Sequence, residues 1–189
     1  MVERKNAKII AFVGLSGTGK SAACEYLAER GVPKVSFGDI IMNALKDADL
    51  DTTVENERMI REKLRLDPAG DVVIGQIISE INHLIEAGQH KIVIDGLGSW
   101  DAYRKLKHEF PADLTVVALT AQRHIRHRRL VQRVERPLTE REVDERDYDM
   151  IETLGKGGVI AIADYFISDT GSVERLHTKI DELLEEIEF

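Results

Sequence analysis

A glycine-rich segment close to the N-terminus constrains the fold of this chain more than any other feature. It reads Gly14-Leu-Ser-Gly-Thr-Gly-Lys20-Ser21 and follows a short apolar run, Lys8 to Val13. Residues Lys20 to Arg30 then carry apolar side chains at helical spacing. The segment therefore joins a strand to a helix, and its spacing of glycines, lysine and serine is typical of a phosphate-binding loop.

The residue types of this loop suit nucleotide phosphates. Its glycines permit a tight backbone whose N–H groups converge on phosphate oxygens at the positive end of the helix dipole. We expect Lys20 to reach the β- and γ-phosphates and Ser21 to place its hydroxyl on Mg²⁺. The predicted nucleotide-binding residues of the loop are Gly14, Ser16, Gly17, Thr18, Gly19, Lys20, Ser21 and Ala22.

Short apolar runs alternate with helical patterns along the rest of the chain. Beyond Lys8 to Val13, the predicted strands are Pro33–Phe37, Lys91–Asp95, Leu114–Leu119 and Ala163–Ser168. Helical signals include Asp67-Pro68 before a long apolar helix, a capping box at Thr139 and Glu142, and Ser172 before the last helix. This alternation predicts an α/β fold, a parallel sheet with helices on both faces. Ligands of such sheets bind at the carboxyl ends of the strands.

The composition fits a soluble protein with a single domain over residues 1–189. Of the 189 residues, 43% are hydrophobic and 32% charged, and no stretch approaches the roughly 20 apolar residues of a membrane span. A net charge of −8 argues against non-specific coating of nucleic acid. Cys24 is the single cysteine, which excludes an internal disulfide and favours a cytoplasmic location; we expect it to pack in a helix.

Asp95 is the second candidate metal ligand, with Ser21. It ends the predicted strand Ile-Val-Ile-Asp, where phosphate-binding-loop proteins carry an acid that binds Mg²⁺ directly or through water. The alternative is a carboxylate that caps the next helix. Asp95-Gly-Leu-Gly98 also fits the DxxG string of GTPases, but no Asn-Lys-x-Asp element for guanine follows the later strands.

Two further groups of residues are candidates for binding a phosphoryl acceptor. Asp39 follows the second predicted strand, where it either accepts a proton from the acceptor or caps the helix that begins there. Arg58, Arg61 and Arg65 share one face of a predicted helix, either as a clamp on an acceptor phosphate or as a solvated face paired with acids. Arg61 is the strongest candidate of the three.

A basic segment, Gln122 to Arg136, is the most unusual local feature of an otherwise acidic chain. Arg126, Arg129, Arg133 and Arg136 recur three or four residues apart, which predicts that most of them lie along one side of a helix. A lid that closes over phosphates would neutralise charge and exclude water. Nucleic-acid contact is less favoured, because the segment has no interleaved aromatic residues.

Taken together, these motifs resemble the nucleoside-monophosphate kinase branch of P-loop proteins, and in particular adenylate-kinase-related and dephospho-CoA-kinase-like proteins. The resemblance extends over nearly the whole chain and is carried by its motifs in their order. These are Phe12 to Ser21, Phe37-Gly-Asp39, Arg61-Glu-Lys63, Val93 to Gly96, Arg146-Asp147 and Ile160 to Ser172.

The resemblance implies a three-layer P-loop kinase fold with a five-stranded parallel sheet. It implies an acceptor-binding insertion at 39–67, a small lid at 122–138, and an adenine pocket lined by Asp169 to Ser172, with Asp169 and Gly171 as binding residues. Lys20, Asp39, Arg129 and Arg133 would be the catalytic residues. Two departures from the family pattern are Met42 and Gly98-Ser99, where arginines usually hold the acceptor phosphate.

The main functional hypothesis is phosphoryl transfer, with ATP and Mg²⁺, to a small nucleotide-like acceptor: a nucleoside monophosphate or dephospho-CoA. The alternative is a nucleotide-binding regulatory or interaction protein with slow or no ATP hydrolysis, which Met42 and Gly98 favour. The sequence predicts no membrane partner and does not indicate an oligomeric state.

Overall fold

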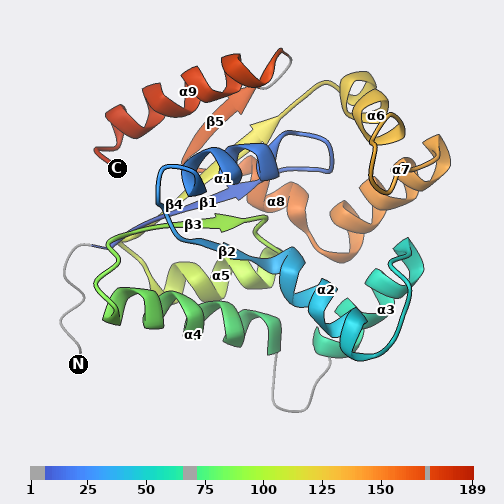
Figure 1. Ribbon diagram of the computed structural model, residues 1–189, viewed down its shortest axis with the longest axis horizontal. Coiled ribbons are helices and arrows are strands. Elements are labelled where there is room, and N and C mark those ends of the chain that lie inside the picture. Colours follow the sequence, from blue (N-terminus) through green and yellow to red (C-terminus); the bar gives the residue numbers. More distant parts are fainter. Residues whose placement is uncertain (1–6, 66–71, 169–170) are drawn as a thin grey trace.

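A single parallel sheet forms the centre of the molecule (Figure 1). The computed structural model describes residues 7–65, 72–168 and 171–189. The strands run in the order β2-β3-β1-β4-β5 and are all parallel. Their bounds are β1 Lys8–Val13, β2 Lys34–Ser36, β3 Lys91–Asp95, β4 Leu114–Thr120 and β5 Tyr165–Ser168. The predicted five-stranded α/β fold is confirmed.

Alternation of buried side chains along β1 explains the three layers. Ile10 and Phe12 point to one face, where they pack with α1 (Lys20–Ala28) and α9 (Val173–Glu186). Ile9 and Ala11 point to the other face. That face is covered by α2 (Phe37–Asp47), α4 (Val72–Glu86), α5 (Trp100–Glu109) and α8 (Lys156–Ala161). Because both faces are covered, the middle parts of β1, β3 and β4 are continuous apolar runs, as is usual for buried parallel strands.

Two insertions extend beyond the carboxyl ends of the strands. The first contains α2 and α3 (Val54–Arg65); the second contains α6 (Arg123–Val131), α7 (Glu140–Tyr148) and a π-helical turn, η1 (Asp149–Thr153). Figure 1 shows both on the side of the sheet to which the strand arrows point. The insertions therefore face the glycine-rich loop that follows β1.

Helix capping matches the sequence signals at one position and differs at another. Thr139 and Glu142 form the predicted capping box of α7. Asp39 does not cap α2, because Ser36 takes that position and its hydroxyl accepts a hydrogen bond from the Asp39 N–H. The predicted cap at Asp67-Pro68 lies outside the described residues.

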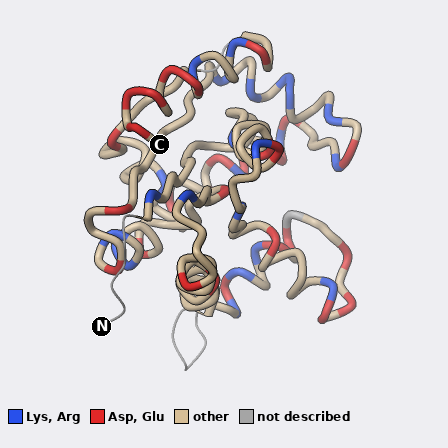
Figure 2. The backbone as a smooth tube through the Cα atoms, turned by 60° about the vertical axis from the view of Figure 1, so that its left-hand side comes forward, with Lys and Arg blue, Asp and Glu red and all other residues tan. Residues whose placement is uncertain are grey.

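The basic segment is only partly helical. Helix α6 ends at Val131, so Arg133 and Arg136 lie beyond it and not along its face. Arg136 adopts a φ of 51°, in the left-handed region where a chain leaves helical geometry. The prediction that most of the four arginines lie along one side of a helix is therefore wrong, because α6 contains only Arg126 and Arg129 of the four. In Figure 2 basic and acidic positions are interspersed along most helices. Within the described ranges no helix is long and apolar enough to span a membrane.

Candidate functional site

The loop between β1 and α1 has a backbone that only glycine can adopt at key points. Gly14, Gly17 and Gly19 have φ values of 154°, 79° and 94°. A Cβ on Gly14 would stand 2.3 Å from the Leu119 carbonyl oxygen, and one on Gly17 would stand 3.0 Å from the Arg126 carbonyl oxygen. The glycines thus permit both the left-handed turns and the close approach of neighbouring chain.

Lys20 is folded back over this loop. Its Nζ donates a hydrogen bond of 2.8 Å to the Leu15 carbonyl, and the Thr18 hydroxyl donates one of 2.9 Å to the same oxygen. Burial lowers the pKa of Lys20 to about 8, against the opposing effect of Asp95. The ammonium is therefore poorly solvated, and an anion bound at the loop would stabilise its charged form.

A cavity of about 340 Å³ opens beside the loop and reaches both insertions. On the loop side it is lined by Ser16, Lys20, Ser21 and Asp95. On the insertion side it is lined by Asp39, Met42, Glu57, Arg61, Arg133, Arg136 and Arg146, and Lys156 of α8 lines it as well. Apolar lining comes from Phe37, Ile41, Val73, Ile74, Met150 and Leu154. One cavity therefore brings together predicted donor, metal and acceptor residues.

Several predicted residues lie elsewhere. Arg58 is exposed and lines a different hollow, between α3 and α7. Arg129 donates hydrogen bonds of 3.2 Å to the carbonyls of Gly17 and Gly171, so it spans the glycine-rich loop and the segment before α9. Asp169 and the side chain of Arg65 lie outside the described part of the structure.

Glu57 is a nearly buried carboxylate at the centre of an arginine cluster. Arg146 Nη2 lies 2.9 Å from Glu57 Oε2, and Arg136 and Arg61 approach Glu57 at 3.7 and 3.9 Å. Arg61 also pairs with Asp149 at 3.0 Å. Two acids thus hold the arginines in place and compensate part of their charge, while desolvation and repulsion from Arg146 and Arg136 lower the pKa of Arg133.

Lys156, at the start of α8, is the least expected member of the cavity. Its side chain is 7% exposed, and burial lowers its pKa to about 7, with further lowering by Lys20, Arg61 and Arg146. The position of Lys156 follows from the packing of α8 against Trp100. Added Cβ atoms on Gly155 and Gly158 would stand 3.0 and 3.1 Å from Trp100, so these glycines let α8 pack closely on that side chain. The glycines around Lys156 are therefore packing residues.

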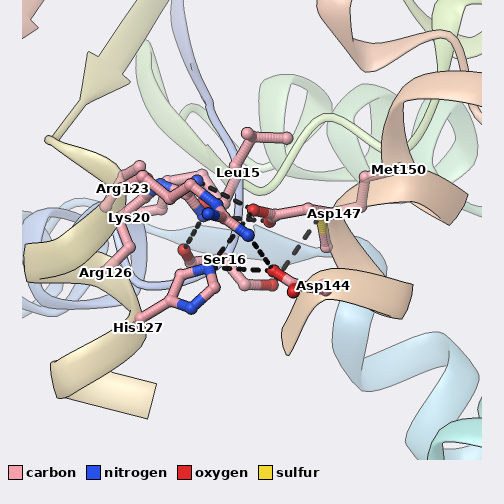
Figure 3. A network of polar contacts seen from close by, with 10 residues as sticks. Leu15, Ser16, Lys20, Arg123, Arg126, His127, Asp144, Asp147 and Met150 are labelled. Carbon is pink, nitrogen blue, oxygen red and sulfur yellow. Dashed lines mark hydrogen bonds and ion pairs between the residues drawn. The ribbon is translucent and has the colours of Figure 1, made fainter. Parts of the chain in front are cut away.

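Arg126 connects the second insertion to the glycine-rich loop (Figure 3). Its guanidinium donates two hydrogen bonds to Asp147, of 2.9 and 2.8 Å, and one of 3.2 Å to the Ser16 carbonyl. Arg126 and Asp147 are 5% and 7% exposed. This buried pair fixes α6 against α7 beside the loop, so Arg126 acts in the framework of the site.

The two departures from the family pattern have structural counterparts. Met42 Sδ accepts a contact of 3.5 Å from Arg136 Nη1, so an arginine from the second insertion reaches the Met42 position. A Cβ on Gly98 would stand 2.7 Å from Phe37 Cδ1. The phenyl ring occupies the space that a side chain at residue 98 would need.

The donor set suits a magnesium ion that is shared with phosphates. Ser21 and Asp95 both line the cavity and offer a hydroxyl and a carboxylate oxygen. In the described ranges no group of three or more His, Cys, Asp or Glu side chains forms a metal cage. Mg²⁺ is commonly held by one or two protein oxygens together with substrate phosphates and water, so the residues present fit it.

Sequence reasoning overlooked the chemistry of Glu57, Arg146 and Lys156. Arg146 was recognisable only as part of a family motif and Glu57 only as an acid on a charged helix, and the two residues, which pair with each other, lie 89 positions apart in the sequence. Lys156 stands between glycines in a segment that reads as a turn. The one available signal was a lysine beginning an otherwise apolar stretch, Gly157 to Ala161.

Comparisons with known proteins agree with this geometry. The profile of an AAA domain family (AAA_18) matches residues 10–149. A UPF0200 protein of Thermococcus kodakarensis is 31% identical over 182 residues, which cover 95% of this chain and 97% of the relative.

Solved structures share the fold. Protein TT1252 from Thermus thermophilus has a TM-score of 0.66 at 18% identity, covering 96% of this chain and 98% of the other. A shikimate kinase from Bacteroides thetaiotaomicron has a TM-score of 0.60 at 14% identity, covering 96% and 99%. These likenesses support the three-layer fold of P-loop kinases.

Proposed function

This chain belongs to the AAA domain family and to the UPF0200 proteins, with the fold of P-loop kinases, and from that premise we propose that it catalyses phosphoryl transfer from ATP, with Mg²⁺, to a small nucleotide-like acceptor. One observation carries the proposal. A single cavity is lined by Lys20 and Ser21 of the glycine-rich loop and by Asp39 and Arg61 of the first insertion. The residues predicted for the donor and for the acceptor therefore line one cavity.

The donor side of the cavity binds the triphosphate. Backbone N–H groups from Gly14 to Ser21 and the N-terminus of α1 provide a positive end for phosphate oxygens. Lys20 then exchanges its hydrogen bond with the Leu15 carbonyl for the phosphates. When bound through Ser21 and Asp95, Mg²⁺ supplies charge neutralisation at the donor phosphates. Arg129, between Gly17 and Gly171, positions the donor end of the site.

The acceptor side orients the group that receives the phosphoryl. Apolar residues such as Phe37 and Ile41 offer a surface for a base or another flat moiety, while Arg61 offers a cation. Asp39 lines the same space and accepts a proton where the acceptor oxygen is a hydroxyl. Arg133, at the cavity wall, stabilises charge that develops on the transferring group.

A nucleoside monophosphate or dephospho-CoA fits this combination of apolar and cationic lining. ATP-dependent chemistry and a buried, neutral Cys24, whose thiol pKa is raised by burial, suit a reducing cytoplasmic compartment. The segment 122–138 would act as the lid and 39–67 as the acceptor insertion.

A second candidate is a nucleotide-binding regulatory protein with slow or no hydrolysis. It is favoured by the charge balance of the acceptor side, where Glu57 and Asp149 already pair with Arg61 and Arg146. In that case the loop binds nucleotide tightly but no acceptor receives the phosphoryl.

The test is a screen with γ-labelled ATP and Mg²⁺ against nucleoside monophosphates, dephospho-CoA and shikimate. Wild type is compared with Lys20→Ala and with Lys46→Ala, a matched change of an exposed lysine at the end of α2. We expect labelled acceptor with wild type and Lys46→Ala, and a loss of at least 100-fold, on the order of the ~3 kcal/mol of a charge-assisted contact, with Lys20→Ala. Equal rates of acceptor labelling by wild type and Lys20→Ala would contradict the kinase proposal.

A further inference from the structure

Lys156 is a buried cation without an acid in contact. Among the described residues its ammonium has no hydrogen bond or ion pair, although the residue is 7% exposed and lines the cavity. Buried ammonium groups are normally paired, because an unpaired charge in a poorly solvated place is costly. The Lys156 ammonium is therefore nearly buried without a protein group, in the described part of the chain, that compensates its charge.

The charges that face Lys156 come from four elements. Lys20 of α1, Arg61 of α3 and Arg146 of α7 all disfavour its charged form, and Asp149 of η1 is the acid that favours it. Arg61 already contacts Asp149 at 3.0 Å, so that carboxylate is shared. The excess of positive charge at this point of the cavity is suited to an anionic ligand.

The position of Lys156 also indicates which anionic group would contact it. Lys20 belongs to the donor side of the cavity, whereas Arg61 belongs to the acceptor insertion, and both act electrostatically on Lys156. Lys156 also lines the one cavity that the donor-side and acceptor-side residues share. In a transfer reaction, the group found between donor and acceptor is the phosphoryl group in transit.

We propose that Lys156 is a catalytic residue that contacts the phosphoryl group as it passes from donor to acceptor. This inference rests on the proposed function. In the transfer, the bond between the γ-phosphorus and the bridging oxygen of ADP breaks and a bond to an acceptor oxygen forms. Where that oxygen is a hydroxyl, its proton passes to Asp39. Lys156 stays protonated throughout and neutralises charge on the phosphoryl oxygens.

Calorimetric binding of three probes tests the assignment: the non-hydrolysable ATP analogue AMPPNP, ADP and AMP, each with Mg²⁺. Wild type is compared with Lys156→Met, Lys156→Arg and the surface control Lys46→Met. We expect Lys156→Met to weaken AMPPNP binding by about 10- to 100-fold, the range of a charge-assisted hydrogen bond, and to change ADP binding by less than about twofold. Lys156→Arg should recover most of the loss.

A second readout distinguishes contact from a structural role. Measuring the AMPPNP heat at pH 7.5 in two buffers of different ionisation enthalpy gives the protons taken up on binding. Wild type should take up more protons than Lys156→Met, because phosphate oxygens favour the protonated lysine. Melting curves of each variant without ligand report folding separately.

The outcomes separate this inference from the proposed function. Equal AMPPNP affinity and proton uptake in wild type and Lys156→Met would overturn the role of Lys156 while leaving the kinase proposal intact. Weaker AMP binding with unchanged AMPPNP binding would overturn it too, since Lys156 would then hold the acceptor's own anion. Failure of wild type to bind AMPPNP or ADP would overturn both.

Discussion

Arg126 and Asp147 form a two-point hydrogen-bonded ion pair, at 2.9 and 2.8 Å, between helices that are separated by a non-helical segment. Both side chains are nearly buried, and Arg126 also donates to the Ser16 carbonyl of the glycine-rich loop. Paired geometry of this kind orients a guanidinium rigidly. The position of the second insertion relative to the loop therefore depends on this pair.

Breaking the pair on one side should destabilise the protein. Arg126→Met leaves the Asp147 carboxylate buried without its partner, so we expect a loss of about 3–5 kcal/mol in the free energy of unfolding. Urea denaturation of wild type and variant measures this change in the free energy of unfolding. The control is Arg123→Met, also in α6, which removes a more exposed ion pair with Asp144 of α7 and should cost less than about 1 kcal/mol. Similar losses for the two variants would contradict a structural role for Arg126.

Removing the charge of Lys156 should stabilise the ligand-free protein in a pH-dependent way. The folded-state pKa of about 7 lies below the ordinary value of 10.5, so between these values the folded state binds fewer protons and gains stability as pH rises. Below pH 7 the full cost of the buried ammonium is present. We expect Lys156→Met to gain about 1–3 kcal/mol at pH 6 and clearly less at pH 9.5.

Urea unfolding at these two pH values checks the prediction. Lys46→Met is the control, since its exposed side chain should give no such pH dependence. A gain for Lys156→Met that is equal at both pH values, or a loss at pH 6, would show that the ammonium is satisfied in the folded protein.

Gly17→Ala separates backbone strain from crowding at the nucleotide loop. Gly17 and Gly31 both have a left-handed φ, of 79° and 83°, but a Cβ on Gly17 would stand 3.0 Å from the Arg126 carbonyl oxygen whereas one on Gly31 meets no atom within 4 Å. Each alanine variant should lose about 1 kcal/mol or more of stability from strain. Gly17→Ala alone should weaken AMPPNP binding by more than tenfold in calorimetry. Equal binding by both variants would mean that the loop tolerates the added methyl group.

Arg61 and Arg58 provide a matched pair on one helix for the acceptor side. Arg61 lines the cavity and Arg58 does not. With the acceptor found in the screen, steady-state kinetics of Arg61→Ala should show kcat/KM reduced about 10- to 100-fold, whereas Arg58→Ala should stay within about threefold. If Arg58→Ala has the larger effect, the acceptor binds between α3 and α7 instead.

The sheet was predictable because buried parallel strands have a continuous apolar signature. The largest difference is at the start of β5, which was expected at Ala163 and begins at Tyr165. The Asp164 carboxylate accepts a hydrogen bond of 2.8 Å from the Val116 N–H, while the Asp164 N–H bonds the Val116 carbonyl. A side chain thus replaces part of the ladder there, which apolar patterning does not reveal.

The arrangement of the glycine-rich loop was predictable for a local reason, whereas the contacts among the residues of the two insertions were not. Lys20 and Ser21 are adjacent to the glycines that position them, so one short motif contains the arrangement. Arg61, Glu57 and Arg146 meet only after two insertions fold together, and helical spacing did not distinguish Arg61 from the exposed Arg58. Lys156 depends on the packing of α8 against Trp100, which no local pattern indicates.

The most direct test of phosphoryl transfer is a ³¹P NMR time course of wild type with MgATP and the acceptor identified in the screen. It measures ADP, phosphorylated acceptor and inorganic phosphate in one sample. The account predicts one phosphorylated acceptor for each ADP, with little inorganic phosphate, because the proposed donor and acceptor sites share one cavity and the bound acceptor would take the place of water there. Inorganic phosphate formed in equal amount to ADP, or ATP that stays unchanged, would contradict it.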